Sequence, residues 1–165
     1  ARFKGMAVRV QPEWFDAGGE LTAFLSNKCD SGGVAAFTGI VRDRDTVDPI
    51  TAMTLEHYPG MTEEMLYRIE MEARTRWDLD DCLIIHRYGR LKPGDPIVIV
   101  LTACAHRKAA FEACEFLVDW LKTKAPFWKI EETVGGKTRW VEARVADADA
   151  AERWMDSQAK ISPVD

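Results

Sequence analysis

The segment IVIVLTACAHRKAAFEACEFLVDWLKTKAPFWKIEE (residues 97–132) decides the fold, because it joins a strand, a helix and an extended segment without a long loop. Residues 97–104 are rich in Ile and Val, which favours a strand. Residues 107–122 carry one apolar stripe at helical spacing, so we expect this helix to pack on a sheet. The stripe consists of Ala110, Cys114, Leu117 and Leu121. Pro126 pushes the residue before it out of helical geometry, so the helix ends near Lys124.

Two hairpins flank this helix in the sequence. The turn Lys92-Pro93-Gly94-Asp95 joins residues 82–88 to residues 97–104 and is typical of antiparallel strands. Beyond the proline, residues 128–133 and 137–143 lie on either side of Gly135-Gly136, which predicts a second hairpin.

The N-terminal half is expected to alternate strands with helices. The hydrophobic spacing predicts an edge strand at 6–11, a helix within 12–28, a well-buried strand at 34–42 and a strand at 50–58. Thr62, followed by two acidic residues, is expected to cap a helix that runs to Asp78. Residues 146–155 are expected to form a short last helix.

This order of elements predicts one α+β domain over residues 1–165, with a mainly antiparallel sheet packed with helices and a loose tail at 155–165. The formal net charge of −5 argues against general nucleic-acid binding, and no apolar run is long enough to span a bilayer. The four cysteines have neither metal-ligand nor disulfide spacing, so we expect thiols that are mostly core residues. Free thiols and the lack of an apolar signal block near the first residue favour a cytoplasmic protein.

Two basic clusters are candidates for a local anion site. Lys122 and Lys129 lie on either side of the Ala-Pro-Phe-Trp turn and could point into one pocket. His106 and Arg107 stand where a strand ends and a helix begins, beside free N–H groups that attract anions. Arg42, at the end of a strand, is a third candidate.

Each candidate also has an ordinary structural explanation. Lys122 and Lys124 are favourable near the negative end of a helix dipole, and an isolated lysine there is more often structural. Arg107 and Lys108 could simply solvate a first turn, and Arg42 alone suits a solvated surface. The bulky aromatic residues are expected in the core rather than on a binding platform. They are Phe127, Trp128, Trp140 and Trp154.

Five motifs add to this interpretation. They are FTGIVR (37–42), TLEHYPGMTE (54–63), AHR (105–107), LKTKAPFWK (121–129) and RWVEAR (139–144). In this order and spacing they resemble the large, catalytic subunit of molybdopterin synthase, over about residues 34–154.

The resemblance implies a fold of the α/β hammerhead type and a homodimer, within a heterotetramer that holds two copies of a small ubiquitin-like subunit. That partner ends in a thiocarboxylate. The reaction transfers its sulfur to cyclic pyranopterin monophosphate and forms the dithiolene of molybdopterin. Neither a metal nor another cofactor is implied in the active site.

The resemblance also implies a set of site residues. Lys122 and Lys129 match the two active-site lysines. The implied substrate-binding residues are Phe37, Arg42, His106, Arg107, Ile130, Glu131 and Arg144. Arg144 matches an arginine that reaches the neighbouring protomer's site. Ile40 departs from the family pattern, because a lysine often stands at that position.

We therefore hypothesise that Arg42, His106 and Arg107 hold the phosphate and pterin of the substrate. Lys122 would donate or accept a proton at the reacting carbons, and Lys129 would neutralise the thiocarboxylate or the oxyanion formed as sulfur is released. The alternative hypothesis is a non-enzymatic docking protein for a ubiquitin-like tail, in which the lysines make electrostatic contacts only.

Overall fold

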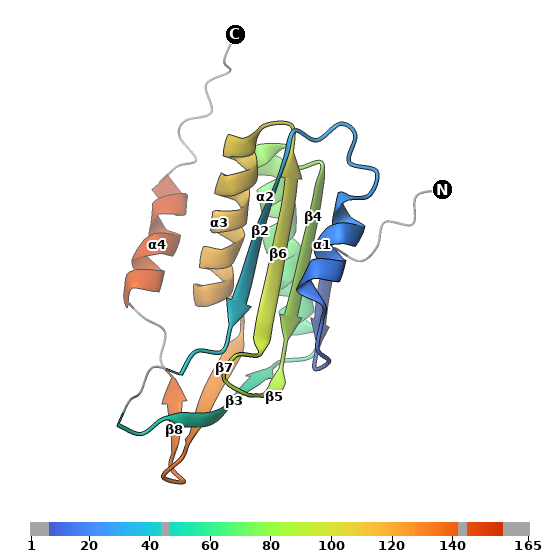
Figure 1. Ribbon diagram of the computed structural model, residues 1–165. Helices are drawn as coiled ribbons and strands as arrows, with labels where there is room; N and C mark the ends of the chain where they lie inside the picture. Colours follow the sequence, from blue (N-terminus) through green and yellow to red (C-terminus); the bar gives the residue numbers. More distant parts are fainter. Residues whose placement is uncertain (1–6, 44–46, 142–144, 157–165) are drawn as a thin grey trace.

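Two four-stranded sheets lie one beyond the other along the molecule and carry the helices (Figure 1). The computed structural model describes residues 7–43, 47–141 and 145–156. The first sheet has the order β1 (Val8–Gln11), β4 (Asp81–Arg87), β6 (Pro96–Cys104) and β2 (Gly33–Ile40). The second has the order β5 (Gly89–Leu91), β3 (Ile50–His57), β7 (Phe127–Thr133) and β8 (Thr138–Val141). The described helices are α1 (Ala17–Leu25), α2 (Met61–Trp77), α3 (Arg107–Thr123) and α4 (Val145–Asp156).

Both predicted hairpins are confirmed, and the first one links the two sheets. Strands β4 and β6 pair antiparallel, as do β7 and β8. Between β4 and β6 the chain leaves the first sheet and adds β5 to the edge of β3 in the second. Within the described residues, only the pair of β1 and β4 is parallel. The α+β fold with mainly antiparallel sheets is therefore confirmed.

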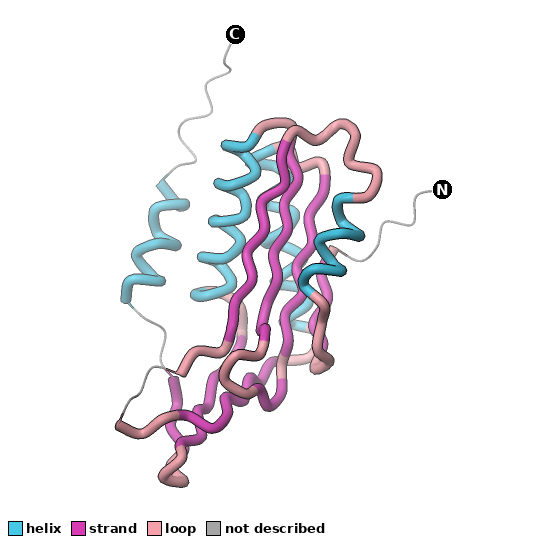
Figure 2. The backbone as a smooth tube through the Cα atoms, in the orientation of Figure 1, coloured by secondary structure: helices cyan, strands magenta, loops and turns pink. Residues whose placement is uncertain are grey.

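Helices cover both faces of the first sheet (Figure 2). Helices α2 and α3 share the main core with one face, and all four residues of the predicted α3 stripe are buried there. Helix α1 packs on the other face, where Phe15 and Phe24 contact the buried side chains of β4 and β6. Helix α4 lies against α3. Because one side of α3 is buried along its length, the sheet determines where both ends of the helix lie.

Two N-terminal predictions were wrong in detail. Strand β2 is an edge strand that ends at Ile40, and Ala35 is its only buried residue, so it is not well buried. The cap of α2 is Gly60, whose backbone N–H donates to the Glu63 carboxylate, and Thr62 is buried inside the first turn. The reason is that the chain turns at Gly60, where a positive φ of 84° lets the helix begin two residues earlier.

The cysteines and tryptophans that were predicted in the core differ in their burial. Cys82, Cys104 and Cys114 are buried and Cys29 is exposed, which confirms that most of the thiols are core residues. Trp154 packs on the main core, but Trp128 and Trp140 are 37% and 65% exposed, so the prediction of both as core residues was wrong. Trp140 lies on β8, the outer strand of the second sheet. No helix among the described residues is long and apolar enough to cross a membrane.

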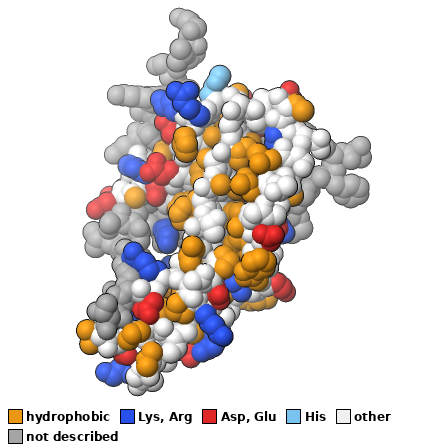
Figure 3. All heavy atoms as spheres, in the orientation of Figure 1, with side chains coloured by type: hydrophobic (Ala, Val, Ile, Leu, Met, Phe, Trp, Pro, Cys, Tyr) orange, Lys and Arg blue, Asp and Glu red, His pale blue; other side chains and the backbone are white. Residues whose placement is uncertain are grey.

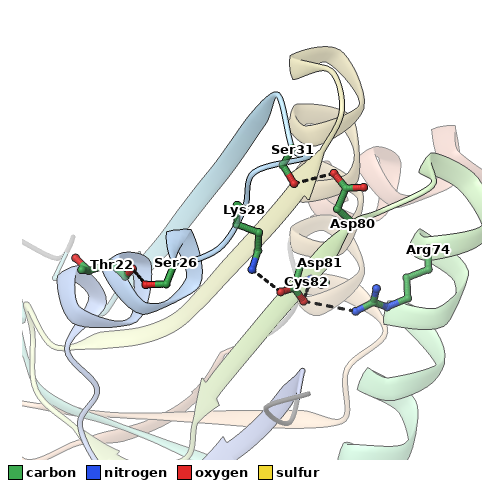
Figure 4. A network of polar contacts seen from close by, with 8 residues as sticks. All are labelled: Thr22, Ser26, Lys28, Ser31, Arg74, Asp80, Asp81 and Cys82. Carbon is green, nitrogen blue, oxygen red and sulfur yellow. Dashed lines mark hydrogen bonds and ion pairs between the residues drawn. The ribbon is translucent and has the colours of Figure 1, made fainter. Parts of the chain in front are cut away.

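A network of charged side chains connects the loop after α1 to α2 and β4 (Figure 4). Lys28 and Arg74 approach the Asp81 carboxylate at 2.8 and 4.0 Å, and Arg74 Nε donates to Glu70 at 2.5 Å. Glu70 is only 2% exposed. Its charge is therefore balanced chiefly by the guanidinium of Arg74, four residues further along α2.

We expect Arg74→Ala to lower the free energy of unfolding by about 3 kcal/mol, because it leaves the Glu70 charge buried without its partner. Arg68→Ala is the matched control. Arg68 makes an i,i+4 pair with Glu64 of the same length on the same helix, but both side chains are exposed, so the loss should be about 0.5 kcal/mol or less. Urea unfolding of both variants measures the difference, and equal losses would contradict the prediction.

Candidate functional site

The turn between α3 and β7 has the predicted form. The helix ends at Thr123, with Lys124 as its last capping residue, and β7 begins at Phe127. The Phe127 N–H donates to the carbonyl of Ala125 at 2.8 Å, which closes the corner at Pro126. The two lysines thus stand on a helix end and on a strand, joined by a short rigid connection.

The register of β7 shows which way its side chains point. Lys129 is opposite Leu55 of β3, and Phe127 is opposite His57. Leu55 is buried in the core of the second sheet, and directly paired residues share one face of a sheet. Lys129 therefore lies on the inner face and is half-buried, whereas Lys122 in the last turn of α3 is exposed.

Four rings, named here the ring block, lie at the inner face beside the lysines. They are His57, His86, Tyr88 and Phe127. The His86 and Phe127 rings are stacked, with centroids 3.8 Å apart and an interplanar angle of 15°. The His57 ring lies 4.2 Å from the Tyr88 ring, and the Nδ1 atom of His57 is buried without a hydrogen-bond partner. The ring block joins the end of β4 in the first sheet to β3 and β7 in the second.

His86 is a neutral group at physiological pH. Burial lowers its pKa to about 3, and the positive charges of Lys129 and Lys122 act in the same direction. A hydrogen bond between Nδ1 and the carbonyl of Arg87, 2.8 Å long, opposes the shift without cancelling it. Both lysines therefore lie within electrostatic range of the one buried imidazole.

Strand β2 and the residues after it carry the predicted residues Phe37 and Arg42 and the unusual Ile40. Strand β2 pairs with β6 so that Ile40 is opposite Pro96, at the end of the sheet to which α3 returns. Arg42 follows two residues later and is exposed. Phe37 packs on the main core, on the face that α2 and α3 cover. Ile40 itself is 57% exposed, so it has no packing role that would explain its difference from the family pattern.

His106 and Arg107 lie at the opposite end of α3, and both are exposed. With a rise of 1.5 Å per residue, Arg107 and Lys122 are about 22 Å apart along the helix axis. Figure 3 shows a histidine beside Lys and Arg side chains at the upper end of the molecule, away from the second sheet. Within one copy of the chain, His106 and Arg107 are therefore far from Lys122. The hypothesis that they hold the substrate on which Lys122 acts does not hold within a single chain.

The start of α3 is held by a close backbone approach. A Cβ atom on Gly32 would lie 1.9 Å from the carbonyl oxygen of Ala105, so only glycine fits there. The N–H of Gly32 donates to the carbonyl of Cys104 at 2.9 Å. The position of His106, the N-cap of α3, thus depends on the chain that precedes β2.

The remaining predicted residues differ in position. Glu131 shares the inner face with Lys129, and its carboxylate accepts a 2.6 Å hydrogen bond from Arg139 Nε. Ile130 alternates to the opposite face of β7, where it pairs with Trp140. Arg144 lies outside the described residues.

Sequence reasoning missed His57 and His86 as part of the site. His57 lies within the motif TLEHYPGMTE, but nothing in the motif shows which way its ring points. His86 lies near the end of an apolar strand, and only the tertiary structure brings it to Phe127. In the part of the chain that the structure describes, no group of three or more His, Cys, Asp or Glu side chains is arranged to hold a metal ion.

Comparison with known proteins gives a consistent result. The family model described as "MoaE protein" matches residues 10–124. The chain is 53% identical over 151 residues to the "Molybdopterin synthase catalytic subunit" of Pseudomonas aeruginosa, covering 92% of this chain and 100% of that protein.

Solved structures agree with the sequence comparison. The "Molybdopterin biosynthesis MoaE protein" from Burkholderia ambifaria has a TM-score of 0.76 and 48% identity, covering 90% of this chain and 97% of its own. A chain from the complex of subunits 1 and 2 of the molybdopterin-converting factor of Helicobacter pylori has a TM-score of 0.70 and 21% identity, covering 84% and 92%. At that identity the second likeness shows the fold alone.

The pKa of His86 predicts an acid-sensitive stability. The folded protein binds this proton only near pH 3, and the unfolded chain binds it near the ordinary value of about 6.5. The contribution of neutral His86 is therefore complete above about pH 6.5 and is lost as the pH falls toward 3. The free energy of unfolding of the wild type falls when the pH is lowered from 7 to 5. We expect this fall to be about 2 kcal/mol smaller in His86→Phe, which has no imidazole to titrate.

Urea unfolding at pH 7 and pH 5, at one fixed protein concentration, measures this difference. Ile85→Ala is the control, because it changes a buried neighbour on the other face of β4 that does not titrate. Its loss between the two pH values should equal that of the wild type. An unchanged loss in His86→Phe would contradict the prediction.

Proposed function

The chain belongs to the MoaE protein family, and we propose that it is the catalytic subunit of a molybdopterin synthase. In this function it transfers sulfur from the thiocarboxylated C-terminus of a small ubiquitin-like subunit to cyclic pyranopterin monophosphate. The 53% identity to a relative of that name, over its whole length, supports the activity. The observation that carries the assignment of the site is the short connection at Pro126. It joins Lys122 in the last turn of α3 to Lys129 on the inner face of β7, where Phe127 stacks on buried His86.

The two lysines differ in exposure, which supports different tasks. Lys129 is half-buried on the inner face of β7, where an ammonium group can neutralise the partner's thiocarboxylate or the oxyanion that forms at its carbonyl carbon. Lys122 is exposed at the end of α3 and can reach a bound substrate as proton donor or acceptor at the reacting carbons. The thiocarboxylate sulfur bonds to a substrate carbon, which loses an oxygen substituent. Water then cleaves the thioester that has formed, which leaves a carboxylate on the partner and a thiol on the substrate.

Neutral His86 supports this division of tasks. A third positive charge beside the lysines would repel them and compete for the incoming anion. The low pKa of His86 keeps the imidazole uncharged, so the positive charge of the site stays on the side chains that meet the substrate. Arg42, on the chain just beyond β2, would contribute to holding the phosphate and pterin.

We propose a homodimer in which a second copy supplies His106 and Arg107. The separation of about 22 Å along α3 supports this, because the substrate's phosphate cannot meet both ends of one helix while it reacts. Arg144 would reach the neighbouring site in the same way. As the family resemblance implies, a small ubiquitin-like subunit would bind each copy of the chain, which gives a heterotetramer.

The setting and extent of the protein are also proposals. We propose that residues 1–165 form one domain, because β5 inserts into the second sheet between two strands of the first. All four cysteines are free thiols, which supports a reducing compartment such as the cytoplasm.

A single-turnover assay tests the function. The purified chain is mixed with thiocarboxylated small subunit and cyclic pyranopterin monophosphate, and the dithiolene product is quantified by mass spectrometry. We expect Lys122→Ala to form product at least about 100-fold more slowly, because a proton-transfer group is lost. Lys124→Ala is the matched control, since Lys124 is an exposed lysine two residues away that lies over the Trp120 ring.

The control variant should retain the wild-type rate within about twofold, as expected for the loss of a surface lysine at a helix end. Normal turnover of Lys122→Ala with saturating small subunit would remove Lys122 from the chemistry. A folded wild type that binds the small subunit but forms no product would favour the docking protein instead.

A further inference from the structure

We propose that His86 is a positioning residue for Lys129, which it orients by stacking on Phe127 across the boundary between the two sheets. His86 is the penultimate residue of β4 in the first sheet, and Phe127 begins β7 of the second. Their rings lie face to face with centroids 3.8 Å apart. The importance of this contact for catalysis rests on the proposed function, but the contact itself and its effect on Lys129 do not.

The imidazole is held rigidly on its own side of the contact. Its Nδ1 is 2.8 Å from the carbonyl of Arg87, so Nδ1 carries the hydrogen and donates it. Arg87 is itself fixed, because its guanidinium donates to the carbonyls of Pro12 and Pro96 at 3.1 to 3.3 Å. A buried residue with three such bonds gives His86 a firm support.

On the other side, Phe127 transmits this support to the lysine. Phe127 and Lys129 point to the same face of β7, two residues and about 7 Å apart. The backbone of Phe127 is tied to Ala125 and to its β3 partner His57, whose ring lies 6.2 Å from that of Phe127. The stack therefore fixes the first residues of β7 at the point where the chain leaves the Pro126 turn.

The position of the site explains why such a device is needed. Lys122 belongs to a helix packed on the first sheet, whereas Lys129 belongs to the second sheet. Any small rotation of one sheet against the other changes the distance between the two ammonium groups. The His86–Phe127 stack bridges this boundary directly beside the lysines, and a shift of about 1 Å in such groups is enough to slow a reaction strongly.

The test compares variants of the stack by the reactivity of individual lysines. His86→Leu replaces the imidazole by an apolar side chain that has no ring. His86→Phe keeps a ring but has no Nδ1 donor. Phe127→Leu removes the stack from its other side. Ile85→Ala is the control, because it weakens the neighbouring core on the α1 face of β4.

Each protein is treated with formaldehyde and cyanoborohydride, and the rate of dimethylation at each lysine is followed by peptide mass spectrometry. Exposed Lys124 serves as the internal reference. We expect the Lys129 rate to rise about threefold or more in His86→Leu and in Phe127→Leu, because the start of β7 opens more often. It should rise less in His86→Phe, which keeps the ring but loses the Nδ1 bond, and stay at the wild-type value in Ile85→Ala.

The single-turnover assay provides the second measurement. With saturating small subunit and substrate, product formation should slow about tenfold or more in His86→Leu and recover in His86→Phe. An unchanged Lys129 rate in folded His86→Leu and Phe127→Leu, or an equal rise in Ile85→Ala, would overturn the positioning of Lys129. If the wild type forms no product, the proposed function fails, and the labelling rates still decide the role of His86.

Discussion

The burial of the α3 stripe against the first sheet is the interaction on which the rest of the structure depends. It sets the direction of a 17-residue helix, and with it the places of the two basic clusters that begin and end the helix. A helix that is buried along one side cannot slide or turn without exposing its apolar residues. The exposed lysine at its C-terminal end is thus carried on one of the most firmly held elements of the molecule.

The second determinant is the junction of the two sheets. The chain crosses this junction when β5 leaves the β4–β6 hairpin, and the ring block fills the adjoining space. Rings suit this position because stacking constrains the relative orientation of elements as well as burying area. Because the low pKa of His86 keeps its ring uncharged, the buried imidazole does not repel the two nearby lysines.

Sequence reasoning was accurate where a local pattern is enough. Pro126 ends the helix by sterics that involve only its neighbours, so the position of the turn could be predicted. It was wrong for Trp140 and for the burial of β2, because an apolar strand does not reveal whether it has a neighbour on both sides. It also missed His86, whose ring partner is 41 residues away in the chain.

The sequence by itself determined the order of the strands and helices except for β5, the rigid corner between Lys122 and Lys129, and the motifs that indicate the family. These features follow from spacing, turn chemistry and residue type, which act over a few residues. Only the tertiary structure decided which groups meet. It separates His106 from Lys122 by the length of α3, because a helix rises by 1.5 Å per residue along its axis. It brings His86 to Phe127, two residues from Lys129, because strand pairing joins distant segments of the chain.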